Sequence, residues 1–406
     1  MSGAIKRVSF KTVGCRLNQA ETARMEASFS DAGYRTVPFG EPCEICVIHT
    51  CTVTARAAQD CARLARGAER MEARPVVVLA GCAVEADPER FKADLTAGQE
   101  QKFDLPRLIA EHFQNDPRII AQTAPSARRN HVPVFNRKRA LLKAQDGCNF
   151  NCSYCIVPAA RGAPVSRPLH EIVNEAKALA DAGYREIVIT GANLGCYRDG
   201  GKKLVHLIQE IEKIGQISRI RLSSIEVSTV EMEIIDFMAS SEKLCRSIHV
   251  PLQSGDDRIL KAMDRHYSSA DYRRVSDYAL SKIPLLGLGT DIIAGLPGED
   301  EGAFRSTISL VREIPFSNLH VFTYSKRSGT RAADMTGQVK GIDKKLRAHE
   351  LKKLGEQKKY DFALKFVGQQ VSVLIEMLTG DSSGTGWTGE YVKAKAPLSD
   401  SSSIGS

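Results

Sequence analysis

The chain has 406 residues, a formal net charge of +8 and a hydrophobic fraction of 43%, enough for about two or three domains with apolar cores. It contains no run of about 18 apolar residues, which argues against a membrane-spanning protein. Residues 1–15 also lack the apolar stretch of a secretion signal. The 11 cysteines are scattered, unlike those of a disulfide scaffold, so we expect a cytoplasmic protein with reduced thiols.

Residues 1–122 predict an N-terminal domain built on an open parallel α/β sheet. Its strands are expected at three apolar runs, 8–13, 45–48 and 76–80. Just past each run lies a cysteine: Cys15, Cys51 and Cys82. Because the carboxyl ends of parallel strands share one sheet edge, these thiols are expected to converge and to hold an iron–sulfur cluster. The alternative, three buried core cysteines, does not explain why each follows a strand.

The segment after the first strand contains residues typical of the N-terminus of a helix. Asn18 and Glu21 have the spacing of a capping box, in which the first side chain accepts amide protons and the second reaches back. Gly33 has the position of a helix-ending glycine. The sequence therefore predicts a helix from about Asn18 to Gly33.

Three further cysteines of this domain, Cys43, Cys46 and Cys61, do not share this position after a strand. Cys43 and Cys46 have the spacing of a metal-binding pair, but Cys46 lies within a predicted strand. We therefore expect five cysteines to be structural: Cys43, Cys46, Cys61, Cys196 and Cys245.

Two basic runs suggest a polyanionic partner such as RNA. The first lies in residues 123–139, a Pro- and Arg-rich stretch that predicts a linker. The second lies in a basic helix expected at 341–366. Each run alone is equally well explained by a solvated face. From charge and position we name three residues as candidate phosphate contacts: Arg137, Lys138 and Arg139.

A second cysteine set, with the spacing C-x3-C-x2-C, occurs on one short segment: Cys148, Cys152 and Cys155. Three thiolates on one loop can hold three irons of a [4Fe–4S] cube and leave the fourth iron open to a ligand. Zinc is the alternative for closely spaced cysteines. Structural zinc usually needs four protein ligands, and no partner pair lies nearby in the sequence.

Residues 140–340 predict a longer series of alternating strands and helices. The strands are expected to begin near residues 140, 186, 219, 246, 285 and 318. Six such units favour a partial parallel (β/α)6 barrel with its chemistry at the carboxyl ends of the strands. Polar or glycine-rich segments follow the strands, and glycines such as Gly191 and Gly295 would let the backbone approach a ligand.

After the basic helix, residues 367–406 predict a short segment of β-strands joined by a Gly/Ser loop. The end of the chain beyond Pro397 is polar and is expected to be disordered. The complete fold prediction is therefore an α/β protein with an open-sheet domain, a partial barrel and a small β tail.

Several long motifs resemble the radical S-adenosylmethionine methylthiotransferases, and the resemblance covers about residues 6–367. The motifs are VGCRLNQAETARM (13–25), TCTVT (50–54), AGC (80–82), DGCNFNCSYCIVPAARG (146–162), HVPLQSGDDRILKAMDRHY (249–267), TDIIAGLPGEDEGAF (290–304) and HVFTYSKRSGTRAADM (320–335). TCTVT and GCRLNQAET are most similar to the branch that acts on N6-threonylcarbamoyladenosine in tRNA. The tail is similar to the start of the family's TRAM RNA-binding domain.

The resemblance implies an enzyme with two [4Fe–4S] clusters and S-adenosylmethionine as cofactors. Cys148, Cys152 and Cys155 would hold the radical cluster, and Cys15, Cys51 and Cys82 an auxiliary cluster. Six residues would form the cofactor pocket: Tyr154, Gly191, Ser224, Glu226, Ile293 and Gly295. In this assignment Ser224 and Glu226 hold the ribose or methionine end, and Ile293 and Gly295 pack on adenine. The alternative for Ser224 is a strand-end cap, and that for Ile293 is plain core.

The same resemblance implies methylthio transfer to carbon 2 of N6-threonylcarbamoyladenosine at position 37 of tRNA. The partners would be the tRNA anticodon loop, an electron donor such as flavodoxin or ferredoxin, and a sulfur donor. We expect a monomer. Three features depart from the family: His49 replaces an asparagine, residues 163–167 differ from the usual basic run, and the TRAM-like tail is short.

Four alternatives remain open on the sequence. The same chemistry could act on isopentenyladenosine-37 of tRNA or on an aspartate of a ribosomal protein. A radical enzyme with a single cluster would contain half the iron. A non-enzymatic iron–sulfur or zinc protein that binds RNA would not cleave S-adenosylmethionine.

Overall fold

The computed structural model describes residues 6–114, 116, 119, 132–135, 138–379 and 382–397. Most of the predicted linker, Arg137 and the polar end at 398–406 lie outside these residues. The chain divides into two compact units. Unit 1 comprises Met1–Asn136, Gly147–Asn149 and Cys155–Ala163, and unit 2 comprises Arg137–Asp146, Phe150–Tyr154 and Pro164–Ser406. Among the described helices, none has the length and apolar character needed to cross a membrane.

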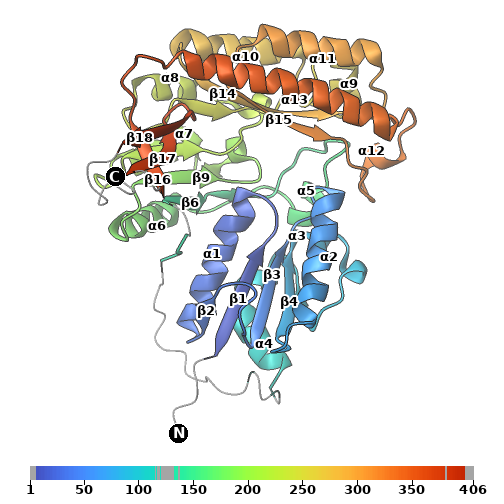
Figure 1. Ribbon diagram of the computed structural model, residues 1–406, viewed down its shortest axis with the longest axis vertical. Helices are drawn as coiled ribbons and strands as arrows, with labels where there is room; N and C mark the ends of the chain where they lie inside the picture. The colour runs from blue at the N-terminus through green and yellow to red at the C-terminus, as the bar shows by residue number, and fades with distance from the viewer. Residues whose placement is uncertain are drawn as a thin grey trace. The chain divides into compact units, whose positions relative to one another are not determined.

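Unit 1 is built on a five-stranded parallel sheet with the strand order β2-β1-β3-β4-β5 (Figure 1). The strands are β1 (Arg7–Thr12), β2 (Arg35–Val37), β3 (Ile45–Thr50), β4 (Val76–Gly81) and β5 (Leu95–Ala97). The helices are α1 (Arg16–Asp31), α2 (Ala55–Glu69), α3 (Cys82–Ala86), α4 (Leu105–His112) and α5 (Val157–Arg161), with 3-10 turns η1 (Pro88–Arg90) and η2 (Gln101–Phe103). The three predicted strands of this domain correspond to β1, β3 and β4.

The two faces of this sheet have separate apolar cores, because successive side chains of a strand point to opposite faces. Ile48 and Leu79 pack on one face with Ala58 of α2. Val47 packs on the other face with Phe29 of α1 and residues of α4. Both faces of β3 and β4 are thus buried, which explains their continuous apolar sequences.

The predicted capping box at the start of α1 is wrong. The helix begins at Arg16, and its N-cap is Cys15, which makes no side-chain capping bond. Asn18 and Glu21 lie inside the helix and are buried. The spacing of a capping box does not fix where a helix begins, and both side chains bond other buried groups, as described below.

Unit 2 contains six parallel strands in two three-stranded sheets, β6-β9-β12 and β13-β14-β15. The strands are β6 (Arg139–Lys143), β9 (Glu186–Thr190), β12 (Arg219–Leu222), β13 (Ser247–His249), β14 (Gly287–Ala294) and β15 (Asn318–Thr323). Backbone bonds from Ile220 to Lys243 and from Ile225 to His249 connect the two sheets. The result is the partial barrel that the sequence predicts, and its six strands begin at or close to the predicted positions.

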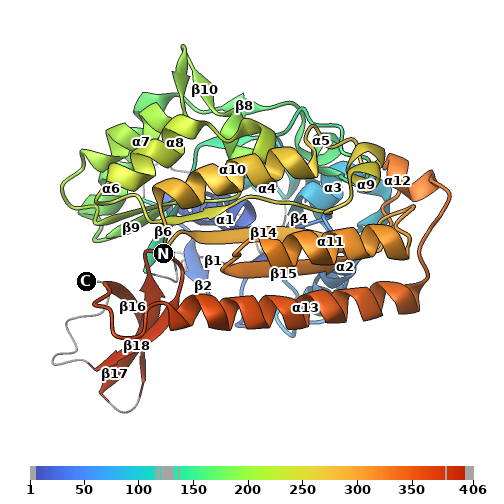
Figure 2. The same cartoon turned by 90° about the horizontal axis from the view of Figure 1, so that it is seen from above.

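Helices follow the strands around this barrel, and α13 lies along β15 (Figure 2). They are α6 (Leu169–Asp181), α7 (Leu204–Glu212), α8 (Met232–Ser240), α9 (Asp257–Ala262), α10 (Ser269–Lys282), α11 (Glu301–Glu313), α12 (Arg331–Asp334) and α13 (Gly341–Leu364). Short elements fill the loops: β7 (Gln145–Asp146), β8 (Val165–Ser166), β10 (Arg198–Asp199), β11 (Lys202–Lys203), η3 (Leu194–Cys196) and η4 (Val227–Thr229).

The tail forms a three-stranded antiparallel sheet of β16 (Val373–Thr379), β17 (Ser383–Thr388) and β18 (Lys393–Pro397). The side chain of Arg221 in β12 bonds this small sheet to the barrel. Its side chain is only 1% exposed, pairs with Glu186 at 2.6 Å and donates to the carbonyls of Thr388 and Gly389 at 2.6 and 3.0 Å. Since Glu186 is the first residue of β9, the tail docks at the amino ends of the strands.

Candidate active site

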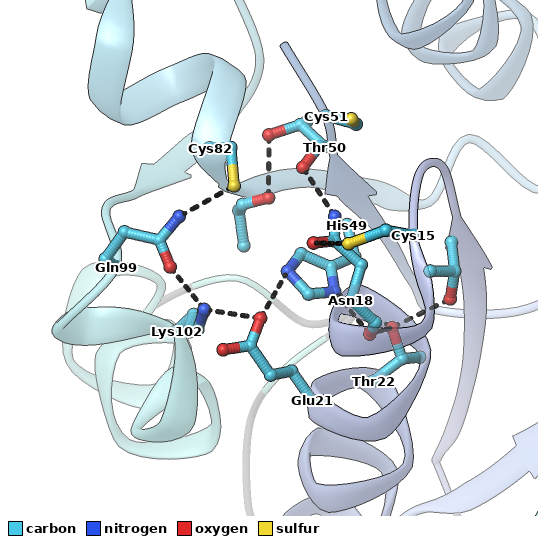
Figure 3. Close-up of polar contacts among 12 residues, drawn as sticks. Cys15, Asn18, Glu21, Thr22, His49, Thr50, Cys51, Cys82, Gln99 and Lys102 are labelled. Atoms are coloured by element: carbon cyan, nitrogen blue, oxygen red, sulfur yellow. Dashed lines mark hydrogen bonds and ion pairs between the residues drawn. The ribbon is translucent and has the colours of Figure 1, made fainter. Parts of the chain in front are cut away.

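Three cysteines converge at the carboxyl edge of the unit 1 sheet (Figure 3). Cys15 follows β1, Cys51 follows β3, and Cys82 is the first residue of α3 directly after β4. Gly14 permits the close approach. A Cβ on this residue, whose φ is +116°, would lie 2.8 Å from Cβ and 2.9 Å from Sγ of Cys51. Any side chain at position 14 would therefore push the first cysteine loop away from the second.

The three thiols also influence one another electrostatically. Burial raises the pKa of the Cys51 thiol to about 12, and the neighbouring Cys15 and Cys82 contribute to the rise. Burial likewise raises the pKa of Cys82, whereas Arg161 and Lys102 oppose that rise. Neighbouring thiolates repel one another unless a positive centre lies between them. The set therefore suits a metal cluster, whose binding displaces the thiol protons.

The Cys61 thiol bonds the backbone of Cys51, one of the three candidate ligands. The backbone N–H of Cys51 donates to Cys61 Sγ at 3.4 Å, and that thiol donates to the Cys51 carbonyl at 3.7 Å. Cys61 also packs in the apolar core of unit 1 with Cys43 and Cys46. Its contacts fix the backbone of one candidate ligand.

Beside the three cysteines lies a buried network of charged groups that the sequence interpretation missed, and Figure 3 shows its Glu21 and Lys102. The carboxylate of Glu21 is 0% exposed, lies 2.7 Å from Lys102 Nζ and accepts two bonds from Arg161 at 3.1 and 3.2 Å. Arg161 also donates to Asn18 Oδ1 at 2.7 Å. The Cys15 thiol lies 3.7 Å from the same Asn18 oxygen. The network thus adjoins the first cysteine of the set.

Gln99 connects the network to another cysteine. Its side-chain Nε2 donates to Cys82 Sγ at 3.1 Å, and its Oε1 accepts from Lys102 Nζ. Since the lysine fixes the carbonyl end of the amide, the N–H end must point at sulfur. Hydrogen bonds to cluster sulfur ligands are among the features that set the reduction potential of an iron–sulfur cluster.

His49, the residue that departs from the family pattern, is buried within this network. Burial lowers the pKa of its imidazole to about 3, so the ring is neutral at physiological pH. Nδ1 lies 2.9 Å from Thr22 Oγ1 and 3.1 Å from the Asn18 carbonyl. The ring therefore adds no charge to the site.

The second cysteine set lies on the loop after β7. The amide of Cys148 donates to the Gly162 carbonyl at 3.1 Å, and Cys155 Sγ accepts from the amide of Val157 at 3.5 Å. Gly147 has φ +67°, and a Cβ there would lie 2.0 Å from the Ala163 carbonyl oxygen. Close backbone packing therefore shapes this loop, and α5 begins directly after it.

Arg265 in unit 2 is a second group that the sequence interpretation missed. Its Nη1 donates to Cys152 Sγ at 3.0 Å and to the Tyr154 hydroxyl at 3.3 Å, while Nη2 pairs with Glu226. Burial raises the pKa of Glu226, and the nearby guanidinium opposes that rise. The arginine thus joins a predicted cluster ligand to two predicted cofactor contacts.

Two buried side-chain oxygens of unit 2 have unused capacity to accept hydrogen bonds. Among the described residues, Glu226 Oε1 and Gln253 Oε1 have no hydrogen-bond partner. Gln253 has a strained φ of +65°, and its carbonyl accepts from the amide of Ile293 at 3.0 Å. Such strain is concentrated at ligand sites. Each oxygen therefore has the capacity to accept a hydrogen bond from a bound donor.

The remaining predicted pocket residues lie at three different places in unit 2. Tyr154 and Ile293 pack against the same apolar cluster. Gly191 and Ser224 lie just past the adjacent strands β9 and β12, and Ser224 is exposed. Gly295 has φ +80°, and a Cβ on it would lie 2.3 Å from Lys344 Cγ. Any other residue at this position would therefore collide with the aliphatic part of the lysine side chain.

The candidate phosphate contacts differ in their surroundings. Lys138 is exposed. The side chain of Arg139 is only 12% exposed, pairs with Glu376 at 2.5 Å and donates to the Tyr391 hydroxyl at 3.0 Å. These contacts assign Arg139 to the docking of the tail. Arg137 lies outside the described residues.

Family models and a solved structure match both parts of the chain. The Radical SAM superfamily model matches residues 142–311, and the model described as Uncharacterized protein family UPF0004 matches residues 7–99. The radical S-adenosylmethionine methyltransferase TsrM from Kitasatospora setae, solved with cobalamin and a [4Fe–4S] cluster, has a TM-score of 0.59 at 16% identity. That alignment covers 81% of this chain and 77% of TsrM and supports the fold.

Curated relatives align with nearly the whole chain. Threonylcarbamoyladenosine tRNA methylthiotransferase MtaB of Aquifex aeolicus is 33% identical over 91% of this chain and 92% of its own length. MtaB of Bacillus subtilis is 33% identical over 95% and 89%. The tRNA-2-methylthio-N(6)-dimethylallyladenosine synthase of Neorickettsia sennetsu is 30% identical over 92% and 84%. The chain therefore belongs to the radical S-adenosylmethionine methylthiotransferases of tRNA, enzymes whose cofactors are S-adenosylmethionine and [4Fe–4S] clusters.

Proposed function

We propose that this enzyme transfers a methylthio group to carbon 2 of N6-threonylcarbamoyladenosine at position 37 of tRNA. The supporting observation is that relatives named for this nucleoside are 33–34% identical over 91–98% of the chain. Those named for dimethylallyladenosine are 30–33% identical over 91–92%. The TCTVT motif at 50–54 favours the same branch.

In this proposal each cysteine set holds one [4Fe–4S] cluster. Cys148, Cys152 and Cys155 hold the radical cluster, and Cys15, Cys51 and Cys82 hold the auxiliary cluster. When bound, these clusters and S-adenosylmethionine supply the radical that opens the C2–H bond and the sulfur that is transferred.

The protein's own residues bind and orient these groups. Glu226 Oε1 has the position and the unused acceptor capacity to take a donor of S-adenosylmethionine. Arg265 holds that carboxylate in place. Tyr154 and Ile293 share an apolar cluster, where they can pack on the cofactor's adenine and exclude water.

The partners in this proposal are the tRNA anticodon loop, an electron donor such as flavodoxin or ferredoxin, and a sulfur donor. The enzyme would act as a monomer. Lys138, which is exposed, stays a candidate phosphate contact. Its substitution should then reduce the dependence of tRNA binding on salt by about one unit of slope.

The first test is mass spectrometry of nucleosides in tRNA from cells with and without the protein. The proposal expects loss of 2-methylthio-N6-threonylcarbamoyladenosine and accumulation of the nucleoside that lacks the methylthio group. Unchanged methylthio nucleosides would refute it.

Iron content tests the two-cluster assignment. Two cubes require about eight irons per chain, and replacing Cys15, Cys51 and Cys82 by Ala should remove about half. That variant should still form 5′-deoxyadenosine from S-adenosylmethionine when reduced. A variant that retains all its iron would show that these cysteines hold no cluster.

The second candidate substrate is N6-dimethylallyladenosine in tRNA, favoured by the relatives of that name. Purified enzyme should be given tRNA carrying either N6 group. Faster methylthiolation of the dimethylallyl form would make N6-dimethylallyladenosine the preferred substrate.

A further inference from the structure

Two histidines and one aspartate of the barrel, none of them used in the proposed function, form a compact cluster. His249 is the last residue of β13, Asp291 lies in β14 and His320 lies in β15. Nε2 of His249 lies 2.9 Å from Oδ1 of Asp291, and Nδ1 of His320 lies 3.3 Å from the same oxygen. One nitrogen or oxygen atom from each residue lies within 4.8 Å of those of the other two. Two imidazoles and a carboxylate therefore converge on one small volume.

The pairing of the three strands brings these side chains together. β14 lies between β13 and β15, and all three strands are parallel. His320 is the partner of Asp291, and His249 is the partner of Gly289. Since residues two apart in a strand share one face, Asp291 lies on the same face as both histidines. A Cβ on Gly289 would lie 2.8 Å from His249 Nδ1, so the missing side chain gives the ring the room to reach Asp291.

The cluster lies on the face of the sheet that is turned away from α13, and solvent reaches it. Leu319 of β15 faces α13, because a Cβ on Gly355 of that helix would lie 3.1 Å from Leu319 Cβ. The next side chain, that of His320, therefore points to the opposite face. The side chains of His249, Asp291 and His320 are 18%, 23% and 53% exposed. An ion and its water ligands can thus enter without unfolding of the strands.

The chemistry of the three groups suits a divalent transition-metal ion. Two imidazoles and one carboxylate are a ligand set of zinc and of ferrous iron, and they leave coordination positions open. Ligand atoms bound to one ion at about 2.0–2.1 Å lie about 3 Å apart, close to the distances of 2.9 and 3.3 Å in this cluster. Among the described residues, the two imidazoles are the only hydrogen-bond and ion-pair partners of the Asp291 side chain. The carboxylate is therefore not held by a lysine or arginine of that part of the chain.

We propose that His249, Asp291 and His320 bind one divalent transition-metal ion, in addition to the iron of the two clusters. Asp291 lies two residues before Ile293 in β14, on the same face and about 7 Å along the strand. Ile293 is one of the residues assigned to the cofactor pocket. The ion would therefore lie on the face of the sheet that carries this pocket, where its open positions can take water or an oxygen of a bound substrate.

The test measures zinc and iron together in the full-length protein with its clusters loaded. After equilibrium dialysis against micromolar zinc chloride, elemental analysis should find about one zinc per chain beside the cluster iron. His320→Gln and Asp291→Ala should each weaken zinc binding at least about 100-fold, because loss of even a hydrogen-bond partner of a metal ligand costs about 10- to 100-fold. Both variants should keep their iron, which shows that they are folded. His170→Gln, at an exposed position of α6, is the matched control and should bind zinc like the parent.

X-ray absorption at the zinc edge separates this site from zinc on cysteines that lack their cluster. Nitrogen and oxygen ligands give bonds of about 2.0–2.1 Å, and thiolates give bonds of about 2.3 Å. The proposal expects the shorter bonds, with an imidazole contribution that is lost in His320→Gln. A parent that binds no zinc would show that the three side chains only bond one another. That result, zinc bound through sulfur alone, or parental affinity in His320→Gln or Asp291→Ala would overturn the proposal. None of these outcomes depends on which nucleoside the enzyme modifies.

Discussion

Arg265 Nη1 lies 3.0 Å from Cys152 Sγ, while Nη2 of the same side chain pairs with Glu226. Both partners are buried, and the guanidinium side chain is only 5% exposed. One guanidinium thus contacts both a candidate cluster ligand, Cys152, and a candidate cofactor contact, Glu226. This relationship makes Arg265 a residue whose removal should affect both folding and binding.

Replacing Arg265 by Met should leave Glu226 buried without its cation. We expect a loss of about 3–5 kcal/mol in the free energy of unfolding, the usual effect of removing one partner of a buried ion pair. Urea unfolding of the metal-free protein measures it. The Glu226→Gln/Arg265→Met double variant should recover much of this loss, and an unchanged unfolding midpoint in the single variant would contradict the expectation.

Replacing Arg221 by Met should destabilise unit 2 by a similar amount, about 3–5 kcal/mol, because Glu186 and two tail carbonyls lose their donor. The matched control is Lys213→Met. This residue pairs with Glu210 on the surface, where both side chains are more than 40% exposed, and it should cost less than about 1 kcal/mol. Equal losses in the two variants would show that the buried pair has no special role.

Gly14→Ala should reduce the iron bound by the holoprotein to about half, or about four irons per chain, because the new Cβ would collide with Cys51. Gly40→Ala is the control: its φ is +102°, yet no atom lies within 4 Å of a Cβ at that position. Both substitutions strain the backbone, and only the first crowds a cysteine. The same iron content in both variants would argue that Gly14 has no role in bringing the cysteines together.

The buried carboxyl of Glu26 should make the free energy of unfolding depend on pH. Burial raises the pKa of this carboxyl to about 7 from an ordinary value of 4.5. The folded state therefore binds the proton more tightly, so stability should fall as the pH rises from 4.5 to 7. The charged form costs up to about 3 kcal/mol above that range.

Glu26→Gln should therefore raise the unfolding free energy at pH 8 and have little effect at pH 4. Glu41→Gln, at an exposed position of the same unit, is the control and should show no such difference. A Glu26→Gln effect that is the same at both pH values would contradict the expected titration.

The carboxyl-edge location of Cys15, Cys51 and Cys82 could be predicted because apolar runs define strands and parallel topology places their ends together. The prediction needs only local sequence and one rule of sheet geometry. The same reasoning placed the six strands of the barrel.

The charged network could not be predicted in this way. Glu21, Lys102 and Arg161 come from three distant parts of the sequence, and each resembles an ordinary surface residue. Asn18 and Glu21 even fit a local capping pattern, which led to the wrong interpretation. Arg265 was likewise visible within a motif, but only the fold brings it to Cys152 and Glu226.

The docking of the tail on Arg221 and Arg139 has a practical consequence for experiments. A truncation after α13, made to ask whether the tail binds RNA, would also expose Glu186 and remove Glu376 and the carbonyls that Arg221 needs. Lost tRNA binding in such a truncation would therefore report a damaged barrel as readily as a missing RNA contact. Substitutions at exposed tail residues such as Lys393 separate the two causes, because they keep the buried ion pairs intact.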